Sequence, residues 1–380
     1  MNLASADLHP GELAVAAVRS LIPYVPGKPI GELEREYGLH DVAKLASNEN
    51  PWGPSVRAVS AMQQALNDIW LYPDGSGHDL RLALARHLQV DAACITLGNG
   101  SNELLVLLAE AFLTPAHNAV YSQYAFSIYP LVVQATGAEG RVAPALPIDD
   151  SMPLGHDLEA MAARADGRTR LIFIANPNNP TGTWLDPAAL RRFIGQAGAD
   201  SIVVLDEAYF EYAQAQGGTD GVAWLGEFPH LVVLRTFSKA YGLAGARVGY
   251  AVSHPEVAEV LNRLRMAFNV NSIALAGAAA ALADAPHMQR CVAATHAELA
   301  PLRRSLEALG LKTIPSAANF LLVHFGAHAA QVYDQLLRQG MIVRPVTAYA
   351  LPEYLRISVG TPAQNQRLLQ LLAALRPGAM

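Results

Sequence analysis

The sequence predicts an α/β protein with a mostly parallel central sheet covered by helices, followed by a smaller α+β domain at the C-terminus. Three apolar runs, rich in β-branched residues and without polar alternation, have the composition of strands buried on both faces: residues 171–175, 201–205 and 231–234. The stretch 187–197 between the first two has a helical pattern. Strands that alternate with helices favour a parallel sheet with crossover helices.

The length and composition indicate a protein of two or three lobes. A chain of 380 residues is too long for a single small core. Because 52% of the residues are hydrophobic and only 16% are charged, we expect much of the surface to be buried between subunits. The net charge of −6 is mild and no run of Lys or Arg occurs, which argues against nucleic acid or an anionic membrane as a partner.

The N-terminus and the lengths of the apolar runs predict a cytoplasmic protein, and the cysteines predict no metal site. Asp7 and Glu12 lie where the apolar part of a signal peptide would be, and no apolar run is long enough to cross a membrane. Cys94 and Cys291 have no CxxC or Cys/His spacing around them, so we expect two buried thiols and no metal.

Changes in the pattern divide the chain into three parts. Residues 1–49, whose prolines favour an extended backbone, are expected to form an arm that packs with the small domain. Residues 50–268 contain the predicted parallel strands and form the large domain. Residues 269–380 turn alanine- and leucine-rich and carry the strand candidates 320–325 and 355–359, which indicates a small C-terminal domain.

Polar residues follow the carboxyl ends of the three predicted strands. Asn176 follows the first strand, Asp206 follows the second, and Ser238 and Lys239 follow the third. Ligands of open α/β sheets bind at these ends. The topology therefore predicts that three separate motifs meet in one crevice.

The segment 236–247 places one lysine and one arginine among small residues. Lys239 is a candidate for forming a Schiff base with an aldehyde, which requires a lowered pKa. Arg247 could supply the neighbouring cation that lowers this pKa, and Ser238 and Arg247 could hold an anion together. The small residues between them let the backbone approach a bulky ligand.

Three further segments carry candidate ligand groups. The turn 98–103 precedes the helical run 104–112, so its backbone N–H groups would lie at a helix N-terminus and could bind an anion. The segment 176–182 packs two prolines and a glycine into a turn directly after a strand, which indicates that the backbone shape itself is needed. Asp206 would place a buried carboxylate at the end of the next strand.

Together these motifs resemble the pyridoxal-phosphate-dependent aminotransferases of fold type I, in the order in which that family carries them. The resemblance implies an aspartate-aminotransferase-like fold in which residues 50–268 bind pyridoxal 5'-phosphate. Lys239 would form the Schiff base, and Asp206 would keep the pyridine nitrogen protonated. The resemblance assigns the other cofactor contacts to the ring hydroxyl (Asn176 and Tyr209), the ring face (Phe126) and the phosphate (Ser101, Asn102, Ser238 and Arg247). Many relatives carry aspartate where Asn102 stands.

Five peripheral motifs make the chain resemble the histidinol-phosphate aminotransferases within that superfamily: residues 23–29, 47–54, 72–77, 343–345 and 355–361. The resemblance assigns substrate binding to Tyr24, Asn48, Arg344 and Arg356. Arginine suits this site because its planar fork pairs with a carboxylate or with a phosphate. The resemblance also implies that Tyr72 reaches the cofactor phosphate of the neighbouring subunit, in a homodimer with shared active sites.

The implied reaction converts histidinol phosphate and 2-oxoglutarate to imidazole-acetol phosphate and glutamate, a step of histidine biosynthesis. It would follow ping-pong kinetics through the Lys239 Schiff base. An aromatic amino acid aminotransferase of the same subgroup is an alternative, because it shares most of these motifs. A phosphothreonine-type decarboxylase is a further alternative, because its lysine, aspartate and phosphate-site motifs would look alike.

Overall fold

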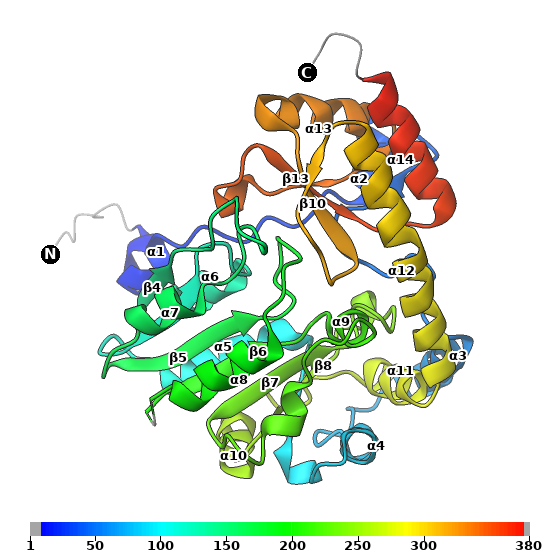
Figure 1. The fold of residues 1–380 in the computed structure, drawn as a ribbon. Helices are drawn as coiled ribbons and strands as arrows, with labels where there is room; N and C mark the ends of the chain where they lie inside the picture. The colour runs from blue at the N-terminus through cyan, green and yellow to red at the C-terminus, as the bar shows by residue number, and fades with distance from the viewer. Residues whose placement is uncertain (1–8, 199, 376–380) are drawn as a thin grey trace, which may run out of the picture.

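The described residues form three β-sheets, of which a seven-stranded one is the centre of a large lobe (Figure 1). The computed structural model describes residues 9–198 and 200–375. The strand order is β2-β8-β7-β6-β5-β3-β4; the strands from β7 to β4 are parallel, whereas β8 is antiparallel to β7 and to β2. These strands are β2 (Ile95–Gly98), β3 (Asn118–Ser122), β4 (Glu139–Ala143), β5 (Thr169–Ala175), β6 (Ile202–Asp206), β7 (Leu231–Thr236) and β8 (Gly249–Ser253).

The three strands predicted from the sequence correspond to β5, β6 and β7, which are neighbours in the sheet. Their register pairs Ala175 with Asp206, and Asp206 with Leu234. The strands therefore end at the same edge, and the residues that follow them meet there. The predicted fold class, with a mostly parallel central sheet, is confirmed.

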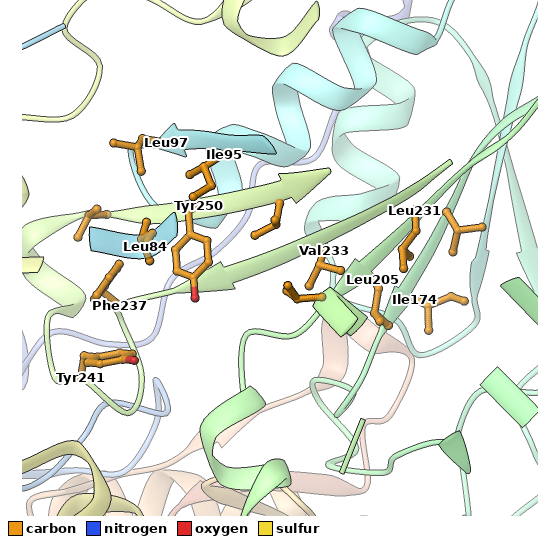
Figure 2. Close-up of a cluster of buried hydrophobic side chains, with 14 of the residues drawn as sticks. Leu84, Ile95, Leu97, Ile174, Leu205, Leu231, Val233, Phe237, Tyr241 and Tyr250 are labelled. Carbon is orange, nitrogen blue, oxygen red and sulfur yellow. The ribbon is translucent and has the colours of Figure 1, made fainter. Parts of the chain in front are cut away.

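Alternate residues of the central strands enter different hydrophobic clusters on the two faces of the sheet. Ile172 and Ile174 belong to one cluster, whereas Leu171 and Phe173 belong to the other. Both faces are covered by helices, which explains why these strands lack polar alternation. Figure 2 shows the first cluster running from Ile174 across the sheet to Tyr250.

Helices α3, α4, α7, α8 and α11 cover the first cluster, and α5, α6 and α10 cover the second. The predicted helices 104–112 and 187–197 correspond to α5 and α8. Helix α11, which the sequence places in the C-terminal domain, packs against α3 and α4 and against the first cluster of the large sheet. The helices of this lobe are α3 (Val56–Ala65), α4 (His78–Leu88), α5 (Ser101–Phe112), α6 (Ile128–Ala135), α7 (Leu158–Arg164), α8 (Pro187–Gln196), α9 (Phe210–Gln214), α10 (Pro255–Leu264) and α11 (Ser272–Leu282).

A smaller α+β lobe contains an antiparallel sheet in the order β12-β13-β10-β9. The predicted strands 320–325 and 355–359 correspond to β10 and β13. The strands and helices of this lobe are β9 (Lys312–Thr313), β10 (Phe320–His324), β11 (Met341–Ile342), β12 (Arg344–Pro345), β13 (Tyr354–Ser358), α12 (Ala285–Ala308), α13 (Ala329–Arg338) and α14 (Pro362–Ala374).

The sequence predicts an extended N-terminal arm, and this prediction is only partly correct. The segment contains the helices α1 (Ala16–Arg19) and α2 (Ile30–Tyr37). Leu33 on α2 is fully buried against Leu337 and Ile342 of the smaller lobe, and this apolar contact stabilises the helix. Strand β1 (Ala43–Lys44) pairs in parallel with β11 of the same lobe. The domain boundaries after residues 49 and 268 stay predictions.

Short 3₁₀ helices connect several of these elements: η1 (Pro10–Leu13), η2 (Leu66–Asp68), η3 (Ala92–Cys94), η4 (Gly221–Trp224), η5 (Ala244–Ala246), η6 (Gly326–His328) and η7 (Thr347–Tyr349). Cys291 is buried as predicted, but Cys94 is partly exposed because it ends the surface turn η3. Among the described residues, no helix has the length and apolar character needed to cross a membrane.

Candidate active site

A cavity of about 250 Å³ lies at the carboxyl ends of β5, β6 and β7, where the sequence predicts the ligand site. Residues from the N-terminal segment, from the start of α5 and from β13 complete its wall. Most of the predicted site residues line it: Tyr24, Asn48, Ser101, Asn102, Phe126, Asp206, Tyr209, Ser238, Lys239, Arg247 and Arg356. The fold thus gathers side chains from distant parts of the chain around one space.

Lys239 lies in the loop after β7, and its Nζ donates a 3.0 Å hydrogen bond to the carbonyl oxygen of Ser47. Burial lowers the pKa of Lys239 to about 8, and the positive charge of Arg356 is the next largest cause. Arg247, which the sequence indicates as the activating cation, contributes less than burial and less than Arg356. The lowered pKa increases the fraction of neutral amine near neutral pH, which is the form that a nucleophilic lysine needs.

Asp206 ends β6 with its carboxylate buried at the cavity. Its Oδ2 accepts a 2.9 Å hydrogen bond from the hydroxyl of Tyr129, and its Oδ1 accepts a 3.2 Å bond from the backbone N–H of Ala208. Burial raises the pKa of Asp206 to about 6, although both hydrogen bonds and the charge of Lys239 oppose this rise. A carboxylate with a pKa in this range suits a hydrogen bond to a ligand group that is itself a weak base.

Tyr209 and Asn48 form a buried hydrogen-bonded pair in the cavity wall. Asn48 Nδ2 donates a 2.8 Å bond to the Tyr209 hydroxyl, and Asn48 Oδ1 accepts a 2.9 Å bond from Ser358 Oγ. Asn48 adopts a left-handed backbone, with φ of 54°, a conformation that asparagine tolerates better than most residues other than glycine. Burial raises the pKa of Tyr209 to about 12. Tyr209 therefore keeps its proton and can donate it in a hydrogen bond to a ligand.

Asn176 and Asn179 lie in the same loop, but their side chains have different surroundings. Oδ1 of Asn176 accepts a 2.9 Å hydrogen bond from the backbone N–H of Leu185, and Asn176 is not among the described residues that line the cavity. Asn179 does line the cavity, and its Oδ1 accepts a hydrogen bond from Arg356. The turn between the two residues presents Asn179 to the cavity, whereas Asn176 supports the loop, and a ligand contact of Asn176 stays a prediction.

Hydrogen-bond donors from three segments form a cradle in the cavity wall. Ser101 and Asn102 open α5, whose first N–H groups have no acceptor within the helix. Nη1 of Arg247 donates to Ser238 Oγ at 3.3 Å. Gly100 has φ of 76° and ψ of 165°, a backbone conformation that other residues rarely adopt, so this position favours glycine. The helix N-terminus and the guanidinium together suit a phosphate.

Arg344 and Arg356 occupy directly opposed positions on the antiparallel strands β12 and β13. Arg356 is buried; its Nη2 donates a 2.7 Å bond to the carbonyl oxygen of Ala46, whereas its buried Nε has no partner. Arg344 is partly buried, with its guanidinium carbon 5.5 Å from the ring centre of Tyr24. No carboxylate of the described chain forms an ion pair with either arginine. Two opposed cations without a counter-ion repel each other, which favours binding of an anion.

Tyr72 and Arg344 are predicted site residues that, in the described part of the chain, do not line the cavity. Arg344 stands beside Tyr24, which does line it. Tyr72 is 82% exposed and stacks on Phe268, with ring centres 4.7 Å apart. An exposed position is what a residue needs if it serves a neighbouring subunit, and this role of Tyr72 stays a prediction.

Sequence reasoning missed three residues of the site. Tyr129 donates to Asp206, Asn179 contacts Arg356, and Glu49 lines the cavity while its Oε1 lies 2.7 Å from Nζ of Lys44. Asn179 and Glu49 lie in the segments 176–182 and 47–54, which the sequence indicates, and Tyr129 lies three residues after the predicted Phe126. A sequence motif indicates which segment lies at the site, but the path of the backbone decides which side chain of that segment faces the cavity.

The side chains of the cavity fit a phosphorylated pyridine aldehyde. The cradle suits its phosphate, the buried carboxylate of Asp206 suits its ring nitrogen, Tyr209 suits its hydroxyl, and Lys239 suits its aldehyde. A mostly parallel sheet with this site at its carboxyl edge defines a fold-type-I pyridoxal-phosphate enzyme.

Comparison with known proteins agrees with this class. The family described as Aminotransferase class I and II matches residues 40–372. Histidinol-phosphate aminotransferase 2 of Pseudomonas aeruginosa is 52% identical over 362 residues, covering 95% of this chain and 96% of that protein. Histidinol-phosphate aminotransferase 2 of Methylococcus capsulatus is 53% identical over 349 residues, with coverage of 92% and 94%.

A solved structure is also similar along nearly the whole chain. The histidinol-phosphate aminotransferase of Sinorhizobium meliloti, in complex with pyridoxal-5'-phosphate, has a TM-score of 0.86 at 30% identity and covers 95% of this chain and 98% of its own. The chain belongs to the class I and II aminotransferase family, and within it to the histidinol-phosphate aminotransferases.

Proposed function

We propose that this enzyme transfers the amino group of L-histidinol phosphate to 2-oxoglutarate, which gives imidazole-acetol phosphate and glutamate in histidine biosynthesis. Relatives named for this activity match the chain along nearly their full length. The observation that carries the substrate assignment is the opposed pair of arginines, Arg344 and Arg356, without a carboxylate partner in the described chain. We also propose a cytoplasmic location.

The arginine pair suits both substrates of this reaction. Histidinol phosphate carries a phosphate and no carboxylate, whereas glutamate carries two carboxylates, and a planar guanidinium pairs with either group. We assign the glutamate carboxylate and part of the phosphate to Arg356, whose unpartnered Nε is buried at the cavity. Arg344 and Tyr24 complete the phosphate site, because they stand together at its edge.

Pyridoxal phosphate, when bound, supplies an electron sink for the negative charge that develops on the substrate carbon. We propose that Lys239 holds its aldehyde, Asp206 its ring nitrogen and Phe126 its ring face. Tyr209 and Asn179 are proposed for the ring hydroxyl, because both line the cavity and Asn176 does not among the described residues. The phosphate contacts are proposed for Ser101, Asn102, Ser238 and Arg247.

Lys239 also carries the proton transfer in this proposal. Its Nζ, once freed from the aldehyde by the substrate amine, would take the proton from the substrate carbon as a general base and deliver it to the former aldehyde carbon of the cofactor as a general acid. A pKa of about 8 lets the amine perform both roles near neutral pH. The bond to the Ser47 carbonyl directs Nζ within the cavity, and Asn48 holds the Tyr209 hydroxyl in place.

The surface around Tyr72 supports the proposal of a homodimer with shared active sites. Ile69, Trp70 and Tyr72 are exposed together on one short segment, and Met266 and Phe268 are exposed beside them through the stack of Phe268 on Tyr72. Exposed aromatic and aliphatic side chains in such a group are typical of a protein interface. Burial of this surface would bring Tyr72 to the partner subunit.

The test of this function is a single-turnover experiment. Cofactor-loaded protein is mixed with L-histidinol phosphate, and separately with L-phenylalanine, while the absorbance of the cofactor is followed. Rapid conversion with histidinol phosphate and much slower conversion with phenylalanine would support the proposal, because phenylalanine has no phosphate for the arginine pair to bind.

The same experiment separates the alternatives. A preference for phenylalanine would keep the fold and the transamination but reassign the enzyme to aromatic amino acids. Release of carbon dioxide from an amino acid phosphate would indicate the decarboxylase. A preference for phenylalanine would also require the phosphate role of the arginine pair to be revised, whereas the decarboxylase would keep that role and change the reaction.

A further inference from the structure

Tyr129 is a completely buried tyrosine that touches two groups of the cofactor site. It lies on α6 and its hydroxyl donates a 2.9 Å hydrogen bond to Oδ2 of Asp206. Its ring stacks on Phe173, with ring centres 4.8 Å apart and an angle of 13° between the planes. The rings of Tyr129 and Phe126 form a T-shaped pair, with ring centres 5.9 Å apart and an angle of 88° between the planes. Ring and hydroxyl are therefore both held in one orientation.

We propose that Tyr129 is a positioning residue of the cofactor site, which holds the Asp206 carboxylate towards the cofactor ring nitrogen and supports Phe126 against the ring face. This inference rests on the proposed function, since it needs Asp206 and Phe126 to contact the cofactor. Tyr129 acts through these two residues, because it is fully buried and does not itself line the cavity among the described residues.

The chemistry of the carboxylate explains why a hydroxyl is needed at this position. Burial favours the neutral acid form of Asp206, whereas a positively charged ring nitrogen needs the carboxylate. The groups that face Asp206 are Tyr129 from α6, Lys239 from the loop after β7, and Ala208 and Tyr209 after β6. Tyr129 makes the side-chain hydrogen bond to it, and such a bond favours the ionised form.

The geometry also leaves the carboxylate free to bind. Tyr129 takes one lone pair of Oδ2 and the Ala208 N–H takes one of Oδ1, so each oxygen keeps a further acceptor site. Phenylalanine at position 129 would keep the stacking on Phe173 and remove only the hydrogen bond. Asp206 would then be free to turn and would favour its neutral form.

The experiment compares Tyr129→Phe with the unchanged protein, both freed of cofactor. Binding of pyridoxal 5'-phosphate is measured beside binding of its carbocyclic analogue, in which a CH group replaces the ring nitrogen. We expect Tyr129→Phe to weaken binding of pyridoxal phosphate about tenfold, the size expected for a hydrogen bond to a charged group. Binding of the analogue should be unchanged, because it has no ring nitrogen for Asp206.

Equal losses for both ligands, or no loss for either, would overturn the inference. Tyr121→Phe is the matched control, since Tyr121 is buried in the same hydrophobic cluster and does not line the cavity in the described chain. It should leave both affinities unchanged. In the Asp206→Asn background, Tyr129→Phe should have no further effect on pyridoxal phosphate binding, and a full tenfold loss there would also overturn the inference.

A second variant keeps the inference testable if Tyr129→Phe does not fold. Placing 3-fluorotyrosine at position 129 preserves the ring and strengthens the hydroxyl as a donor. Pyridoxal phosphate should then bind more tightly while the analogue does not, and an unchanged ratio would overturn the inference. Failure of the unchanged protein to bind pyridoxal phosphate would instead refute the proposed function, which separates the two failures.

Discussion

Replacing Lys239 by methionine should stabilise the cofactor-free protein near neutral pH. The pKa of Lys239 falls to about 8 in the folded chain, against 10.5 for a free side chain. At pH 7 the fold therefore disfavours the protonated amine, and the difference 10.5 − 8 = 2.5 units corresponds to about 3 kcal/mol of unfolding free energy. Methionine has a similar length without the charge, so it should remove this cost.

Three effects reduce the gain. Lys239 is only partly buried, so water in the cavity screens its charge. Its hydrogen bond to the Ser47 carbonyl is lost, which costs about 1 kcal/mol. Its charge also helps to keep Asp206 ionised. We expect a net gain of about 2 kcal/mol, which is about 2 to 3 °C in Tm for a chain of this length at about 2.1 cal/mol/K per residue.

The direction of the pKa shift fixes how this gain depends on pH. Because the folded-state pKa is the lower one, the cost is full below pH 8, shrinks as the pH rises towards 10.5 and is absent above it. The assay is thermal unfolding of the cofactor-free proteins at pH 7 and at pH 10.5. Lys312→Met, at an exposed position, is the control and should show no such dependence. A gain of equal size at both pH values, or a loss of stability at pH 7, would refute the reasoning.

Further predictions concern the substrate site, the loop that contains Asn176 and Asn179, and the dimer. Arg356→Gln should lower kcat/KM for histidinol phosphate about a hundredfold or more, because Arg356 is buried. Arg344→Gln, at a less buried position, should lower the same kcat/KM about tenfold. Equal losses of kcat/KM in steady-state kinetics would contradict this ranking. Asn179→Ala should weaken cofactor binding about tenfold in an absorbance titration, and Asn176→Ala should weaken it much less. A larger loss for Asn176→Ala would show that Asn176 contacts the cofactor. Trp70→Glu should shift the protein from dimer to monomer in analytical ultracentrifugation, and a dimer of unchanged stability would place the interface elsewhere.

The fold class could be predicted because its central strands are buried on both faces. Residues such as Ile172 and Phe173 enter opposite clusters, and this double burial appears in the sequence as an unbroken apolar run. The arm was harder to predict. Helix α2 follows Pro29 in a stretch where proline favours an extended chain, and it is stabilised by the contact of Leu33 with the smaller lobe, which lies some 300 residues away along the chain.

The sequence by itself determined the segments of the site, since Lys239, Asp206 and Ser101 all lie where a strand ends or a helix begins. These positions follow from local chain chemistry: apolar runs end at polar residues, and a helix N-terminus leaves N–H groups free. The sequence could also indicate the arginines, but not that Arg344 and Arg356 stand opposite each other, because that depends on the pairing of β12 with β13.

Tertiary structure alone decided which side chain of each segment faces the cavity and what sets its charge. Asn179 rather than Asn176 reaches the cavity because the loop turns between them. Lys239 owes its lowered pKa first to burial and then to Arg356, more than to the neighbouring Arg247 that local spacing indicates. Electrostatic energies depend on distance in space and on the exclusion of water, and both are properties of the folded chain that spacing along the sequence does not encode.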